Sequence, residues 1–168
     1  PYSGLVSTSP LEDSTVTDSA ASATAFATGV RVSYTALSMD RAGKKLPTAL
    51  EAAEALDKST GLVTTTNFWD ATPAAFAAHA ATRYETDTII EQMMKSGAEV
   101  IAGGGAARFG REGRGTLDDL GAAAGYAIVK SAAELQTVGA GRVLAVFATQ
   151  PQEVDFPDVR LPILTRFA

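Results

Sequence analysis

The sequence predicts an α/β fold: a three-layer α/β/α sandwich around a mostly parallel central sheet. Short apolar segments typical of strands alternate with longer helix-like segments along the chain, which is the pattern of layered α/β proteins. Hydrophobic residues make up 46% of the 168 residues, enough for a core, whereas aromatic residues make up only 7%. Alanine and glycine dominate instead, which favours helices packed closely against a sheet.

Composition excludes several classes of function. The formal net charge is -5 and there is no run of Lys or Arg, which argues against binding nucleic acid but not against a small anionic substrate. The chain has no cysteine, so disulfides and thiolate metal sites are excluded. No apolar run approaches the roughly 20 residues of a membrane span.

The first helix is expected at residues 19–28. Residues 14–17 are short and β-leaning, and they lead into Asp18, a good N-cap residue. Gly29 is expected to end the helix.

A second helix is expected at residues 46–56, with Pro47 in its first turn and with Glu51 and Glu54 pointing outward. Residues 61–66 then form a buried strand.

A third helix is expected to open at Thr72 as N-cap, with Pro73 at its first position. A fourth, at 85–95, carries an apolar stripe of Ile89, Ile90, Met93 and Met94. The remaining expected elements are strands at 100–102, 126–129 and 142–148, helices at 117–124 and 132–136, and an irregular tail at 149–168.

The length fits one domain, so residues 1–168 are expected to form a single domain. The chain starts without Met at Pro1 and stops at Ala168, so both ends are expected to be cuts through a longer protein. The alternative is a small processed domain.

The segment 16–25 places a serine hydroxyl, that of Ser19, at a helix N-terminus. Free backbone N–H groups and the helix dipole favour negative charge at that point, whether an alkoxide or a bound phosphate. The alternative is that Ser19 only caps the helix.

A second polar segment runs from Asp70 to Arg83. A hydroxyl and a carboxylate, here those of Thr72 and Asp70, are hard oxygen donors that suit Mg²⁺. Arg83 offers a planar fork that matches phosphate oxygens. Each residue also has a plain structural alternative, as a cap or as a solvated surface side chain.

Both segments resemble signatures of the alkaline phosphatases: Val-x-Asp-Ser followed by small residues and Thr at 16–24, and Asp-Ala-Thr-Pro-Ala-Ala at 70–75. The resemblance implies that Ser19 is the nucleophile that becomes a phosphoserine. It also implies that Asp18 orients the arginine and that Arg83 grips two phosphate oxygens.

The same resemblance implies metal ions, two Zn²⁺ and one Mg²⁺ in the complete enzyme. Thr72 would be a direct magnesium ligand, Asp70 would order magnesium-bound water, and Ser19 would be held by zinc as an alkoxide. Most ligands are absent from this chain, which has one histidine, no cysteine and no Asp-Gly-Met-Gly segment. The chain is therefore expected to be the N-terminal half of a catalytic domain and to be inactive alone.

Two other features are expected to be structural. His79 is the only histidine, and the family places no zinc ligand at this position. The run 103–105 lacks the GK[ST] continuation of a phosphate loop and is expected to be a turn.

The resemblance implies a phosphomonoester hydrolase that acts on small substrates and releases inorganic phosphate. It further implies a periplasmic or secreted location and a possible homodimer in the full-length protein. The expectation of no nucleic-acid partner and no membrane span comes from the charge and from the apolar runs instead. The alternatives are a related sulfatase or phosphodiesterase, or a non-catalytic phosphate-binding domain.

Overall fold

The computed structural model describes residues 4–12, 16–110 and 115–147. The chain divides into two compact units. The helical unit comprises Pro1–Asp57 and Trp69–Ser96, and the sheet unit comprises Lys58–Phe68 and Gly97–Ala168. The expected tail at 149–168 lies outside the described residues, and the expectation of a single domain stays a prediction.

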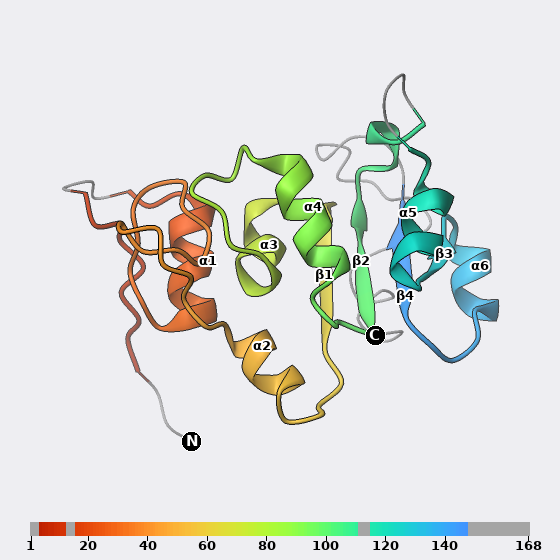
Figure 1. Ribbon diagram of the computed structural model, residues 1–168, viewed down its shortest axis with the longest axis horizontal. Helices are drawn as coiled ribbons and strands as arrows, with labels where there is room; N and C mark the ends of the chain where they lie inside the picture. Colours follow the sequence, from red (N-terminus) through yellow and green to blue (C-terminus); the bar gives the residue numbers. More distant parts are fainter. Residues whose placement is uncertain (1–3, 13–15, 111–114, 148–168) are drawn as a thin grey trace. The chain divides into compact units, whose positions relative to one another are not determined.

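The sheet unit contains four strands in the order β1-β2-β4-β3: β1 (Gly61–Asn67), β2 (Val100–Gly104), β3 (Ala127–Val129) and β4 (Val143–Val146). Figure 1 shows β2 and β4 within this sheet. Every strand pair is parallel. The predicted α/β class with a mostly parallel sheet is therefore confirmed.

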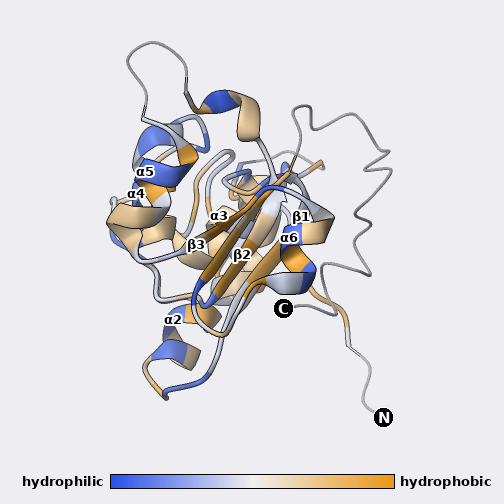
Figure 2. Cartoon of the chain, turned by 90° about the vertical axis from the view of Figure 1, so that its right-hand side faces the viewer, coloured by the Kyte–Doolittle hydropathy of each residue, from blue (hydrophilic) through white to orange (hydrophobic). Residues whose placement is uncertain are grey.

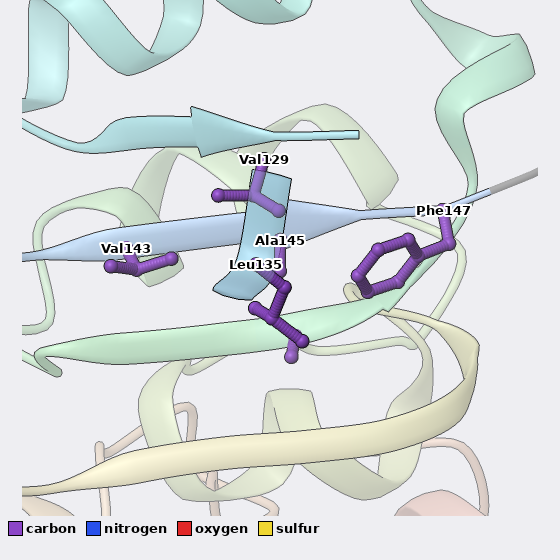
Figure 3. Packing of buried hydrophobic residues seen from close by; sticks show 6 residues of the cluster. Val129, Leu135, Val143, Ala145 and Phe147 are labelled. Carbon is purple, nitrogen blue, oxygen red and sulfur yellow. The ribbon is translucent and has the colours of Figure 1, made fainter. Parts of the chain in front are cut away.

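One face of the sheet is covered by α6 (Ala132–Thr137). Leu135 of this helix belongs to a buried cluster with side chains from three strands and the residue after β4 (Figure 3). The other members are Ala102, Val129, Val143, Ala145 and Phe147. Val143 and Ala145 are two residues apart on β4, so their side chains share one face.

The opposite face is covered by α5 (Leu117–Ala124). Gly121 of this helix packs so closely on Ile128 that a Cβ atom would lie 2.3 Å from Ile128 Cδ1. Because Ile128 neighbours Val129 on β3, it points to the other side of the sheet. Helix, sheet and helix thus form three layers within this unit, and Figure 2 shows hydrophobic residues along the strands with hydrophilic ones on α5.

The glycine run after residue 102 was expected to be a turn, but its first two residues belong to β2. Only Gly105, with a φ of 107°, leaves the strand and begins a 3-10 turn at Ala106–Arg108. Gly103 pairs with Val146 within the sheet, and the position is glycine because a Cβ there would lie 2.8 Å from Thr64 Cγ2 and 3.0 Å from the Phe68 backbone.

The helical unit contains α1 (Ser19–Thr28), α2 (Ala49–Glu54), α3 (Ala71–Ala77) and α4 (Thr86–Met94). The bounds predicted for α1 are confirmed: the Asp18 side chain caps its start, and Gly29 ends it with a φ of 72°. Helices α1 and α3 pack against each other, and alanines provide most of their buried residues. The predicted apolar stripe of α4 is buried.

Two predicted helix starts were wrong. α2 begins three residues later than expected, because Thr48 forms a capping box with Glu51 and leaves Pro47 outside the helix. α3 is capped by Asp70 rather than by Thr72, which is already the second helical residue.

Two strand predictions also need correction. β1 was expected to be buried, but its residues are exposed or only partly buried. Of the β-leaning residues 14–17, Val16 and Thr17 are described and lie in no strand.

Candidate functional site

Ser19 is the first residue of α1, and its side chain is exposed. Asp18 fixes this end of the helix, since its Oδ1 accepts a hydrogen bond from the Ala21 N–H at 3.0 Å. The Ser19 hydroxyl therefore lies at the positive end of the helix dipole, where negative charge is stabilised.

Arg83 brings the two predicted segments together. Its Nη1 donates to Ser19 Oγ at 2.5 Å, and its Nη2 donates to Asp70 Oδ1 at 2.6 Å. The same Nη1 lies 3.6 Å from Asp18 Oδ2. Four of the five residues selected from the sequence thus meet at one guanidinium, although they are up to 65 positions apart (83 minus 18).

The backbone of Arg83 is held by the segment that follows α1. Its N–H donates to Thr35 O at 2.8 Å, and the Thr35 N–H lies 3.4 Å from Asp18 Oδ1. Leu37 and Ala80 exchange two backbone hydrogen bonds of 3.0 Å as an isolated antiparallel bridge. Residues 35–38, called the connecting segment below, therefore link the serine helix to the arginine.

Sequence reasoning missed what holds this connecting segment in place. Thr24, fully buried, donates through Oγ1 to Ala36 O at 3.3 Å and accepts from the Ser38 N–H at 2.9 Å. Ser38 Oγ donates to Ala75 O of α3 at 2.5 Å. The signal was present: Thr24 belongs to the predicted signature, but a buried hydroxyl has to find partners that only the fold supplies.

Thr35 and Ser38 also adopt left-handed backbone conformations, with φ of 66° and 47°. Non-glycine residues adopt this region uncommonly and at a cost in free energy. The hydrogen bonds of Thr24 and Ser38 over-determine the segment and so keep it in this shape.

Carboxylates outnumber the guanidinium at Arg83 by two to one. The guanidinium lies between two carboxylates, and Asp18 Oδ2 is buried with no hydrogen-bond partner among the described residues. A guanidinium has five N–H donors. Hydrogen bonds within the described part of the chain use two of them, which leaves donors for an incoming oxyanion.

The predicted magnesium residues occupy the start of α3. Asp70 Oδ1 accepts from Ala71 N–H at 2.8 Å as well as from Arg83, and the exposed Thr72 follows two residues later. These two oxygen donors fall well short of the octahedral set that Mg²⁺ demands. Across residues 4–12, 16–110 and 115–147, no three His, Cys, Asp or Glu side chains gather around one point. These residues therefore do not form a complete metal centre, and we assign no reaction step to a metal.

The fold and this site define a class: an α/β protein that presents a serine hydroxyl and an arginine fork at a helix N-terminus, an arrangement suited to oxyanions. The family model for alkaline phosphatase matches residues 1–146. The chain therefore belongs to the alkaline phosphatase family.

Individual relatives agree with this membership. The chain is 38% identical over 152 residues to alkaline phosphatase 4 of Bacillus subtilis, covering 86% of this chain and 33% of that protein. The crystal structure of Thermus thermophilus alkaline phosphatase superposes with a TM-score of 0.86 and 35% identity over 98% of this chain and 37% of that one. A TAB5 alkaline phosphatase mutant solved with Mg bound superposes with a TM-score of 0.76 and 29% identity over 86% of this chain and 42% of that one.

The chain thus spans about a third of the length of the curated relatives it matches. Among the described helices, none combines the length and the apolar character needed to cross a membrane.

Proposed function

We propose that this chain carries the nucleophile and phosphate-binding part of a phosphomonoester hydrolase. The observation that carries the proposal is the contact between Arg83 Nη1 and Ser19 Oγ at 2.5 Å. A phosphate bound by the arginine fork would bring its phosphorus next to the serine oxygen, which is the arrangement that nucleophilic attack needs.

In the proposed reaction, Ser19 Oγ loses its proton and forms a bond to phosphorus as the bond to the leaving alkoxide breaks, which gives a phosphoserine. The leaving alkoxide takes up a proton and departs as the alcohol. Water then releases inorganic phosphate and restores the serine. Arg83 binds two phosphate oxygens and offsets the charge that develops on them. Asp18 holds the arginine in place through its charge and caps the serine helix through its other oxygen.

Metal ions belong to this proposal for the complete protein, as two Zn²⁺ and one Mg²⁺. Thr72 and Asp70 would contribute to the magnesium site, and zinc would contact Ser19, which requires ligands beyond those described. Bound metals supply positive charge that lowers the barrier to attack. A periplasmic or secreted location, small phosphomonoester substrates and a homodimer are likewise proposed only for the full-length protein.

The test is phosphate binding by the chain, measured by calorimetry with inorganic phosphate. Arg83→Ala should weaken binding at least about tenfold, because a bidentate charged contact is lost. Arg41→Ala is the matched control: it removes the same charge from the same unit, at an arginine that pairs with Glu12. Equal affinities in the two variants would contradict the proposed role of Arg83.

The second candidate is a phosphate-binding domain without catalysis. The incomplete metal centre of the described residues favours it for this chain alone. The two candidates differ in turnover. If a protein that includes the remaining family segments binds phosphate but releases no product from a phosphomonoester, the non-catalytic candidate is supported.

A further inference from the structure

His79, expected to be merely structural, is a buried titratable group that the proposed reaction does not use. It follows the C-cap residue of α3, and its side chain is 7% exposed. Its Nδ1 lies 2.8 Å from Ser38 O, and its Nε2 lies 2.9 Å from Glu51 Oε1. The ring therefore joins the end of α3 to the start of α2 and to the segment that follows α1.

The two partners bear on the protonation state of this ring. A backbone carbonyl only accepts hydrogen bonds, so Nδ1 carries a hydrogen. The Glu51 carboxyl is a carboxylate at neutral pH, and its Oε2 already accepts the Thr48 N–H at 2.9 Å. Both ring nitrogens of His79 therefore face oxygen atoms that accept hydrogen bonds, an arrangement that a ring with a hydrogen on each nitrogen satisfies fully.

The Glu51 carboxyl is consistent with this pairing. Partial burial, the largest single influence, raises its pKa, but the hydrogen bond and charge of His79 together with the Thr48 hydrogen bonds lower the pKa below 4.5. Ion pairing of this kind compensates the cost of a charge that is nearly out of contact with water.

The groups that face His79 come from three elements. Glu51 of α2 is the one charged group that contacts the ring within the described part of the chain, and Ser38 contributes a neutral carbonyl. From α4, the neutral Gln92 side chain accepts from the His79 N–H at 3.0 Å and donates to its carbonyl oxygen at 2.8 Å.

Position along the chain connects this ring to the candidate site. Immediately after His79, Ala80 pairs with Leu37, and Arg83 then donates to Thr35 O. The ring holds Ser38, at the other end of the same connecting segment. The two segments joined by this isolated bridge thus carry His79 on one side and its partner Ser38 on the other.

We propose that His79 is a positioning residue for Arg83, acting as a buried imidazolium clamped between Ser38 O and the Glu51 carboxylate. Its charge keeps residues 35–38 and 79–83 in register, and the register sets the guanidinium against Ser19. The proposal rests on the phosphate-binding role proposed for Arg83.

The first test uses the fact that His79 is the only histidine of the chain. In the 168-residue chain labelled with ¹⁵N-histidine, both ring nitrogens should show a bound proton at neutral pH. In Glu51→Gln, a variant of the same shape without the charge, the Nε2 proton signal should be lost and the Nδ1 signal kept. A neutral ring in the unaltered chain would overturn the proposal.

The second test measures amide hydrogen exchange. Glu51→Gln and His79→Gln should each lower the protection of the Arg83 and Leu37 amides about tenfold, since a charge-assisted hydrogen bond is lost. The Ile89 amide, bonded to Glu85 O in α4, is the control and should stay within about threefold.

Unchanged protection at Arg83 in both variants would refute the positioning role. That result would leave the proposed function intact, because the Arg83→Ala comparison measures phosphate binding directly. Conversely, the unaltered chain could fail to bind phosphate while Glu51→Gln and His79→Gln still lower the protection of the Arg83 amide. That result would contradict the proposed function and keep the positioning role of His79.

Discussion

At the scale of single residues, the site depends on polar side chains that each serve two partners. Arg83 joins Ser19 to Asp70, and Asp18 caps a helix with one oxygen while the other faces the guanidinium. Thr24 likewise serves two partners in the connecting segment: its single hydroxyl donates to Ala36 O and accepts from the Ser38 N–H. Such a side chain is hard to replace where both partners are buried, as those of Thr24 are, because its loss leaves both of them unsatisfied.

Thr24→Val is the sharpest test of this reasoning. Valine keeps the shape but leaves the buried Ser38 N–H and Ala36 carbonyl without a partner, so the free energy of unfolding should fall by about 1–3 kcal/mol. Thr28→Val, one turn later, removes a hydroxyl that donates to Thr24 O and accepts from the exposed Val30 N–H; because water can replace the bond to Val30, the variant should cost less than about 1 kcal/mol. Urea denaturation of both variants measures the difference, and equal losses would contradict the assigned role of Thr24.

At the scale of elements, the sequence predicted correctly the helix ends that are set by a local capping side chain or by a glycine. Asp18 and Gly29 bound α1, as expected from a capping side chain and from the backbone freedom of glycine. The start of α2 was missed because Thr48 and Glu51 outcompete the preference of Pro47 for a first turn. The partner of Glu51 is 28 residues away, which no local pattern reveals.

The same contrast applies to the candidate site. Residue types and order pointed to Ser19, Arg83, Asp18 and Asp70, and the structure brings these four together. Thr72 stays a predicted magnesium ligand. The connecting segment was not predicted, because its shape depends on two left-handed residues, Thr35 and Ser38, that are not glycine.

The close packing around Gly103 in β2 can be tested by substitution. Gly103→Ala would place a Cβ 2.8 Å from Thr64 Cγ2 and 3.0 Å from the Phe68 backbone, and backbone cannot move aside cheaply. The variant should lose about 1–3 kcal/mol of stability. Gly139→Ala is the control, since its Cβ would meet nothing within 4 Å. Similar thermal melting of the two variants would show that the sheet unit tolerates the larger residue.

The start of α2 should respond to acid. The pKa of Glu51 is lowered from 4.5 in the folded protein, so its contribution to stability is complete above that value and is lost as the pH falls through the lowered pKa. Glu51→Gln cannot titrate, so its stability should decline less steeply between about pH 6 and about pH 3. Urea midpoints across this range provide the measurement, and parallel curves would contradict the prediction.

At the scale of the whole molecule, the chemistry is distributed unevenly. Ser19, Arg83, Asp18, Asp70 and Thr72 all belong to the helical unit, whereas the parallel sheet belongs to the sheet unit. The described residues bring the proposed oxyanion fork and the proposed nucleophile into contact, but they hold no cluster of three His, Cys, Asp or Glu side chains for a metal ion. If both proposed roles are right, phosphate binding and turnover can be measured separately, since binding needs only groups already in contact.

The 168-residue chain should accordingly bind inorganic phosphate yet fail to hydrolyse p-nitrophenyl phosphate when Zn²⁺ and Mg²⁺ are supplied. Attack by a serine hydroxyl that is not activated is slow, and Arg83 stabilises charge without removing the serine proton. Release of p-nitrophenol is the measurement, and Ser19→Ala is the control that separates true turnover from a contaminating enzyme. Robust hydrolysis that Ser19→Ala abolishes would mean that this chain completes a metal centre from residues outside those described.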